Sequence, residues 1–214
     1  MGTVVVEATK GATKALKDHL GYVGRQPGTV VRDSDAWYTP GAIIERVRAV
    51  LGTIDLDPFS SRAANETVRA AYYFDPTFSA LDRPWRSPQQ RRRYPGGVNV
   101  WMNPPYSIPL ITQAIAAFVR AVQAGEVAQA IVLVNNATET RWFQRLCRVS
   151  TAVCFPGFRI AFTAPDGKAV AGNTRGQAFV YVPGTRNTTV AFLRAFADVG
   201  VLMTLEGGRH GEAE

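Results

Sequence analysis

The sequence predicts an α/β domain with a mixed, mostly parallel sheet and an antiparallel final hairpin. The chain has 214 residues, of which 46% are hydrophobic and 19% charged, a composition typical of one globular domain. Short apolar runs alternate with segments of helical period, as expected for parallel strands joined by helices. The run 130–134 (AIVLV) is apolar at every position, which is typical of a strand buried on both faces.

The first half of the chain divides into an arm and the start of the domain. Residues 1–34 are weakly patterned and are expected to form an N-terminal arm, followed by one domain over 35–206 and a tail over 207–214. We expect the first helix to have Thr39 as its cap, Pro40 at its first position and Gly52 as its end. A strand over 53–57 (TIDLD) and a short helix over 65–71 follow.

The second half continues the alternation after a region, 75–97, that is rich in Pro, Gly and Arg and is predicted to be a loop. The predicted strands are 98–102 (VNVWM), 130–134, parts of 151–163 and 177–182, and 201–205. The predicted helices are 110–122, 139–149 and 188–199.

The net charge of +7 is concentrated in the middle of the chain. Residues 1–82 carry 9 basic and 10 acidic side chains, residues 83–165 carry 10 and 2, and residues 166–214 carry 5 of each. The central excess of +8 consists of arginines, whose guanidinium groups match phosphate oxygens and base edges. A solvated surface in an arginine-rich protein is the alternative, since the chain has 20 Arg and 4 Lys.

Several classes of protein are disfavoured. No apolar run reaches the roughly 18 to 20 residues of a membrane-spanning helix, and no secretory signal is visible, so we expect a cytoplasmic protein. Cys147 and Cys154 are expected to be reduced thiols in the core, because two cysteines make no disulfide framework. His19 and His210 lack partners at ligand spacing, and no metal site is expected.

The strongest motif is Asn103-Pro104-Pro105-Tyr106, directly after the predicted strand 98–102. Ligands of open α/β sheets bind beyond the carboxyl ends of the strands. The two prolines make the turn rigid and leave carbonyl oxygens as acceptors. The Asn103 side-chain oxygen and the Pro104 carbonyl can therefore accept hydrogen bonds from one planar amino group, while Tyr106 offers a face for stacking.

With this motif the chain resembles the Dam-like DNA adenine-N6 methyltransferases, a family often found in phages and prophages, so that the cytoplasm would be that of a bacterial host. The resemblance covers about residues 35–183 and rests on short motifs in a specific order. These are Trp37, Thr39-Pro40, Asp55-Leu56-Asp57-Pro58, Asn65, Tyr72-Tyr73, Leu81 to Trp85, Asn103 to Ser107, Thr140 to Phe143 and Gly157 to Phe162.

The resemblance implies a Rossmann-like class I methyltransferase fold that uses S-adenosylmethionine and acts on DNA. Asn103, Pro104, Pro105 and Tyr106 would hold an adenine flipped out of the duplex and direct its amine at the methyl group. Direct transfer needs no covalent nucleophile. The residues implied to contact the cofactor are Trp37, Thr39, Pro40, Asp57, Pro58, Phe59 and Asp75.

The chain departs from the related pattern at two places. The Asp-Pro-Phe loop continues as Ser60-Ser61-Arg62 where related enzymes have Gly-x-Gly, which we interpret as a trait of the Dam-like group. Position 79 is Ser where the family often has Asp, so Asp75 or Asp82 is the candidate for the acidic cofactor contact. For Asp75, a solvent-facing turn before Pro76 is an equal alternative.

The arginines before the motif are predicted to contact DNA, because they are close in sequence to the base-flipping site. The predicted contacts are Arg86, Arg91, Arg92, Arg93, Arg141 and Arg159, the last two on weaker grounds; a disordered charged insertion is the alternative for the run 83–93.

Three other functions stay open on the sequence alone. Protein glutamine N5-methyltransferases also use Asn-Pro-Pro-Tyr, but normally with a glycine-rich cofactor loop. Cytosine-N4 methyltransferases usually have Ser in place of Asn103. A catalytically inactive DNA-binding module would retain the basic region without transfer.

Overall fold

The computed structural model describes residues 38–75, 80–163 and 175–206. Within them, one sheet has the strand order β2-β1-β3-β4-β6-β5-β7. The expected arm over 1–34, the tail over 207–214 and the candidate Trp37 lie outside the described residues. The strands are β1 (Leu56–Asp57), β2 (Tyr72–Tyr73), β3 (Val98–Met102), β4 (Val127–Asn135), β5 (Ala152–Pro156), β6 (Gln177–Pro183) and β7 (Gly200–Thr204).

The sheet is mixed. The pairs β2–β1, β1–β3 and β3–β4 are parallel. Strand β6 is antiparallel to both β4 and β5, and β7 is antiparallel to β5. It follows that β2, β1, β3, β4 and β5 point one way and β6 and β7 the other, so the antiparallel part is larger than the predicted final hairpin.

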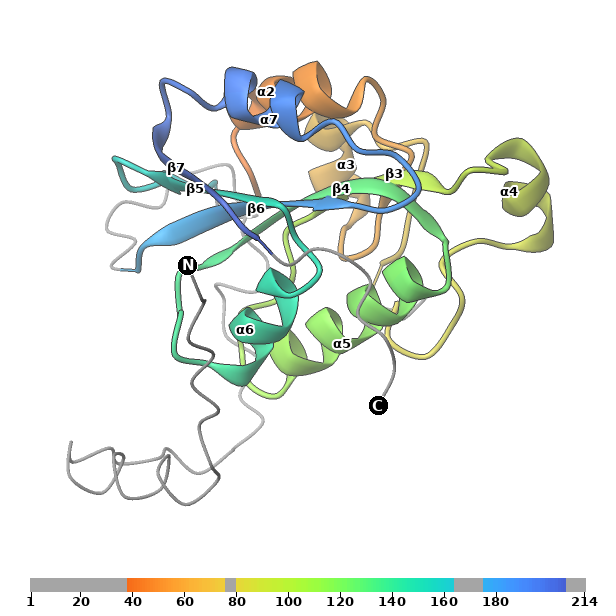
Figure 1. Cartoon of the computed structure of the whole chain (residues 1–214). Helices are drawn as coiled ribbons and strands as arrows, with labels where there is room; N and C mark the ends of the chain where they lie inside the picture. The colour runs from red at the N-terminus through yellow and green to blue at the C-terminus, as the bar shows by residue number, and fades with distance from the viewer. Residues whose placement is uncertain (1–37, 76–79, 164–174, 207–214) are drawn as a thin grey trace, which may run out of the picture.

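Helices cover both faces of the sheet (Figure 1). On one face lie α2 (Gly41–Leu51), α3 (Arg62–Val68) and α7 (Thr189–Ala195); on the other lie α5 (Leu110–Gln123) and α6 (Arg141–Cys147). The short α4 (Pro88–Arg93) projects beyond the end of the sheet. The architecture is therefore a three-layer α/β domain, in agreement with the predicted class.

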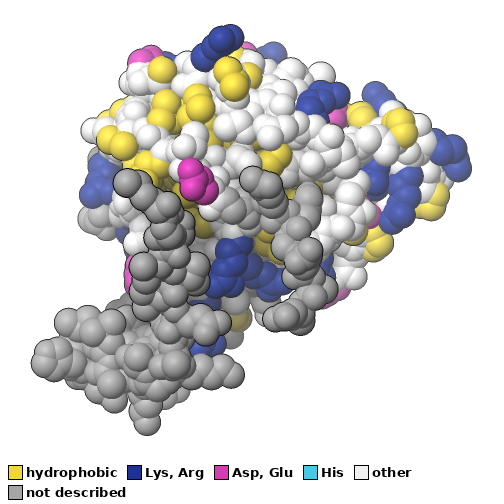
Figure 2. All heavy atoms as spheres, in the orientation of Figure 1, with side chains coloured by type: hydrophobic (Ala, Val, Ile, Leu, Met, Phe, Trp, Pro, Cys, Tyr) yellow, Lys and Arg dark blue, Asp and Glu magenta, His cyan; other side chains and the backbone are white. Residues whose placement is uncertain are grey.

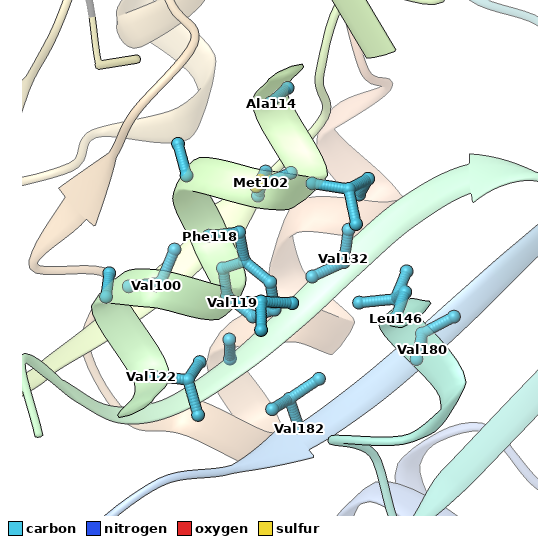
Figure 3. Packing of buried hydrophobic residues seen from close by; sticks show 14 of the residues in the cluster. Val100, Met102, Ala114, Phe118, Val119, Val122, Val132, Leu146, Val180 and Val182 are labelled. Atoms are coloured by element: carbon cyan, nitrogen blue, oxygen red, sulfur yellow. The ribbon is translucent and has the colours of Figure 1, made fainter. Parts of the chain in front are cut away.

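The core has two halves because side chains alternate along each strand. Val100 and Met102 of β3 face α5, where Phe118 packs against them (Figure 3). Trp101, between them in sequence, belongs to the cluster under α2 and α7. Residues 130–134 of β4 likewise alternate between the two clusters, so this strand is buried on both faces, as its unbroken apolar run predicted.

Two predicted helix starts need correction. Thr39 does not cap α2; its hydroxyl instead accepts a hydrogen bond from a side chain at the end of β3, and Pro40 occupies the cap position without a side-chain bond. The helix predicted over 65–71 is α3, which begins three residues earlier because the Ser61 hydroxyl accepts from the Ala64 amide.

The region 75–97 contains a helix that the sequence analysis missed. Helix α4 has a reciprocal capping box in which Ser87 and Gln90 bond each other's backbone amides, with Pro88 at the first position. The Ser-Pro-x-Gln spacing is a helix-start signal, which the surrounding Arg, Pro and Gly obscured.

Candidate active site

The strand order reverses between β1 and β3. From β1 the chain continues outward to β2, whereas from β3 it continues in the other direction to β4. Such a reversal opens a crevice at the carboxyl ends of the two strands, where ligands of open α/β sheets bind. Asp57 is the last residue of β1, and Asn103 directly follows β3. The two strongest sequence candidates thus lie at the carboxyl ends of adjacent strands.

The Asn-Pro-Pro-Tyr corner is held by its own side chains. The Tyr106 hydroxyl lies 2.7 Å from Asn103 Oδ1 and 3.2 Å from the Leu133 carbonyl, so its one proton is shared between two acceptors. Burial raises the pKa of Tyr106 far above its ordinary value, which keeps the phenol a neutral donor. Tyr106 therefore orients Asn103 in addition to presenting its ring.

Thr39 holds the other end of the same amide. Asn103 Nδ2 donates to Thr39 Oγ1 over 3.3 Å, and Thr39 is only 6% exposed. An isolated bridge between Tyr38 and Thr163 fixes this segment beside the sheet. With a donor on its oxygen and an acceptor for its nitrogen, the Asn103 amide has one defined orientation.

Asp57 is a buried carboxylate at the end of β1. It is 3% exposed, and burial raises its pKa from 3.8 to about 7, against the lowering effect of the Ser60 hydroxyl and the Phe59 amide. The Phe59 amide donates to Asp57 Oδ1 over 3.3 Å. Ser60 Oγ lies near the carboxylate but meets no partner with full hydrogen-bond geometry. A cation beside Asp57 would favour its ionised form.

Asp75 follows β2, the strand next to β1. The Phe74 amide donates to the Asp57 carbonyl, and the Ser60 amide donates to the Phe74 carbonyl. These two bonds tie the end of β2 to the loop after β1. Of the residues implied to contact a cofactor, Thr39, Pro40, Asp57, Pro58, Phe59 and Asp75 are described, and they line the ends of β1 and β2 and the start of α2.

Arg86 has a structural role in place of the predicted DNA contact. It is 8% exposed, and its two terminal nitrogens donate to the carbonyls of Tyr94 and Gly125. It thereby fastens the segment before β3 to the turn before β4. A guanidinium committed to backbone carbonyls in the interior is not available to a phosphate.

The arginines of α4 lie at the end of the sheet opposite to Asn103. Helix α4 precedes β3, and Arg91 pairs at 3.0 Å with Glu126, which precedes β4. Five residues of β3 separate this end from Asn103, roughly 16 Å at the rise of a strand. Dark-blue side chains gather on this projecting end (Figure 2). Arg91, Arg92 and Arg93 are exposed, but proximity in sequence did not mean proximity in space.

Arg141 and Arg159, the weaker sequence candidates, lie at the site's own end of the sheet. Arg141 begins α6, after the end of β4, and Arg159 follows the end of β5, which runs parallel to β4. Both side chains are exposed. They are the two predicted arginines that the fold places on the same edge as Asn103.

Sequence reasoning missed three polar residues at this edge: Ser60, Asn135 and Gln177. Asn135 ends β4 and Gln177 begins β6, and the two are paired in register. Their signal was a polar side chain at the border of an apolar strand, a weak one because most strand ends are polar.

Other chemistries find no support in the described residues. Among them, no group of three or more His, Cys, Asp or Glu could hold a metal ion. Cys147 and Cys154 are free thiols, and burial raises the pKa of Cys154 to about 11, so that this thiol is protonated at neutral pH. None of the helices in the described ranges has the length and apolar character needed to cross a membrane.

The fold and this corner define a methyltransferase-like α/β protein. The comparison with known families agrees: the model of the family described as DNA N-6-adenine-methyltransferase (Dam) matches residues 26–197. The chain belongs to this family, and it is a DNA N6-adenine methyltransferase. A search of curated proteins found no match.

Proposed function

We propose that the protein transfers a methyl group from S-adenosylmethionine to the N6 amine of adenine in DNA, at the crevice between the ends of β1 and β3. The observation that carries this proposal is the placement of Asp57 and Asn103 at adjacent strand ends on either side of the switch point. A Rossmann-like class I methyltransferase fold is supported by the reversal of strand order between β1 and β3 and by the antiparallel β6 beside β4.

The residues present fit this cofactor. Asp57 is a buried carboxylate whose raised pKa signals that a positive partner would be favourable. Ser60 Oγ is a buried polar atom beside the Asp57 carboxylate that meets no partner with full hydrogen-bond geometry, so it has capacity for a hydrogen bond with a ligand. Asp75 at the end of β2 has the position at which an acidic residue binds ribose hydroxyls in related sheets. When bound, S-adenosylmethionine supplies an electrophilic methyl group on a sulfonium.

The Asn103 corner is suited to hold the amine. Asn103 Oδ1 already accepts from Tyr106, but an amide oxygen has two lone pairs and can accept a second hydrogen bond. With the Pro104 carbonyl it would receive both N–H groups of the adenine amine, which directs the nitrogen lone pair outward and raises electron density on the nitrogen. The duplex base must leave its stack to reach this corner, and Arg141 and Arg159 lie where its phosphates would pass.

The first experiment measures transfer of a labelled methyl group from S-adenosylmethionine to unmethylated DNA, followed by separation of the nucleosides. Label in N6-methyladenine is the expected result. Asn103→Ala should abolish transfer while the fold is retained, whereas Gln89→Ala, an exposed position on α4, should leave transfer unchanged. The second variant controls for expression and handling.

The same assay separates the alternatives. Label in N4-methylcytosine would assign the site to cytosine, and label in a protein substrate but not in DNA would favour a glutamine methyltransferase. Absence of label together with absence of cofactor binding by calorimetry would favour an inactive DNA-binding module. Each of these results would overturn the proposed reaction.

A further inference from the structure

Three amide side chains form a row across the carboxyl ends of adjacent strands. Asn103 follows β3, Asn135 ends β4 and Gln177 begins the antiparallel β6. The strands β3, β4 and β6 are consecutive in the sheet. We call Asn103, Asn135 and Gln177 the amide row.

The amide row faces one side of the sheet. Trp101, Leu133 and Phe179, each two residues from a member of the row on its own strand, all pack in the cluster under α2 and α7. Because side chains on a strand alternate with a period of two, the three amides share this face. The bond from Asn103 to Thr39, which immediately precedes α2, places Asn103 there directly.

Gln177 fixes the orientation of Asn135. Gln177 is 3% exposed, and its Nε2 donates to Asn135 Oδ1 over 3.3 Å. Because the Asn135 oxygen accepts this hydrogen bond, the Asn135 Nδ2 group is the end of the amide that can donate to a ligand. Within the described ranges no residue accepts from this Nδ2, and the side chain is partly exposed.

Gln177 itself is incompletely satisfied. Its Oε1 is buried and has no hydrogen-bond partner in the described part of the chain. A buried acceptor without a partner destabilises the fold, and an apolar residue would suit a purely structural position better. The loss of stability is explained if the Gln177 amide has a function at the site.

We propose that Asn135 donates from Nδ2 to a ring nitrogen of the target adenine, N1 or N7, and that Gln177 is the positioning residue that holds Asn135 in this orientation. Asn103 and Asn135 lie on neighbouring strands, about 4.8 Å apart, and are offset by two residues along the strands, about 6.7 Å. The two residues are therefore separated by roughly 8 Å. With Asn103 on the exocyclic amine, this separation suits a second contact on the same purine. The inference rests on the proposed function and adds a determinant of the base that is accepted.

The test combines variants with altered bases. Duplexes carry adenine, 1-deazaadenine or 7-deazaadenine at a position that the labelled-methyl assay has first shown to be methylated, and kcat/KM is measured for each. For the wild type, removal of the contacted nitrogen should lower kcat/KM about ten-fold. Asn135→Ala should show a similar loss on adenine and no further loss on that analogue.

The controls separate this contact from a structural effect. Asn136→Ala alters the exposed neighbour and should keep the sensitivity of the wild type to the analogue. Asn135→Asp keeps an acceptor for Gln177 but removes the donor, and should behave as Asn135→Ala does. Gln177→Met should lose sensitivity in part, with the affinity for S-adenosylmethionine unchanged.

Two results would overturn the inference. One is that the fold-losses in kcat/KM caused by Asn135→Ala and by each deaza substitution multiply. Multiplying losses would mean that the two changes act independently and remove different contacts. The other is that Asn135→Ala retains the kcat/KM of the wild type. If the proposed function itself fails, the wild type methylates no adenine in the first step, which is a different outcome.

Discussion

Removal of the buried charge of Asp57 should stabilise the protein in the absence of ligand. The rise in the pKa of Asp57 from 3.8 to about 7 corresponds to about 4 kcal/mol at full ionisation. Between pH 4 and 7 the folded state holds a proton that the unfolded chain has released, so the stability of the wild type falls as the pH rises through this window. Asp57→Asn has no such group and should gain about 2 to 4 kcal/mol at pH 8, and almost nothing at pH 4.

The measurement is urea unfolding of the wild type and Asp57→Asn at pH 4, 6 and 8. The free energies of unfolding should diverge as the pH rises, with unchanged slopes. Asp198→Asn is the matched control, in which the expected change in stability has the opposite sign. A hydrogen bond from Arg46 lowers the pKa of Asp198. Loss of the Asp198 carboxylate should therefore destabilise the protein at pH 8, and less so in acid. A gain from Asp57→Asn that is absent at pH 8, or equal at all three pH values, would refute the reasoning.

Three further results are expected. Tyr106→Phe keeps the ring but loses the hydroxyl that orients the Asn103 amide, so transfer should fall about ten-fold; full activity would contradict this role. Arg159→Ser should reduce the salt dependence of DNA binding by about one phosphate contact, and Arg93→Ser, at the other end of the sheet, should leave it unchanged; filter binding at several salt concentrations compares them. Gln177→Met should be as stable as the wild type or more stable by up to ~1 kcal/mol. The side chain of Gln129 has hydrogen-bond partners on both its oxygen and its nitrogen, so Gln129→Met should lose about 2 kcal/mol. Thermal unfolding compares the two variants, and equal losses of stability would be evidence against a functional Gln177.

The alternation of strands and helices was predictable because each element carries a local signal. The strand 98–102 agrees with β3, since four of its five residues are hydrophobic and a Pro-Pro corner follows it. Strand direction beyond β4 was not predictable, because β6 pairs with β4 across 41 or more intervening residues. The residues of a single strand do not indicate which distant strand it will pair with, or in which direction.

The role of Thr39 shows the same limit. A Thr before a Pro at a helix start predicts a cap, and the local rule was sound. The hydroxyl nevertheless bonds Asn103, 64 residues further along the chain. A tertiary partner displaced the local one because α2 starts at the sheet edge where β3 ends. The arginines of α4 show the reverse case: they are close to Asn103 in sequence but not in space, because a strand carries its two flanking segments to opposite edges of the sheet.

The loop after β1 would meet a different charge in the proposed cofactor than it does in a dinucleotide. In dinucleotide sites such loops bring backbone amides and a helix N-terminus against a pyrophosphate, which is an anion. Here the loop after β1 leads into α3, whose N-cap is Ser61. The Ser61 hydroxyl already accepts a hydrogen bond from the Ala64 amide. S-adenosylmethionine carries an ammonium and a sulfonium and no phosphate, so a buried carboxylate is the complementary group. In the proposed function Asp57 would be this group, from the end of β1.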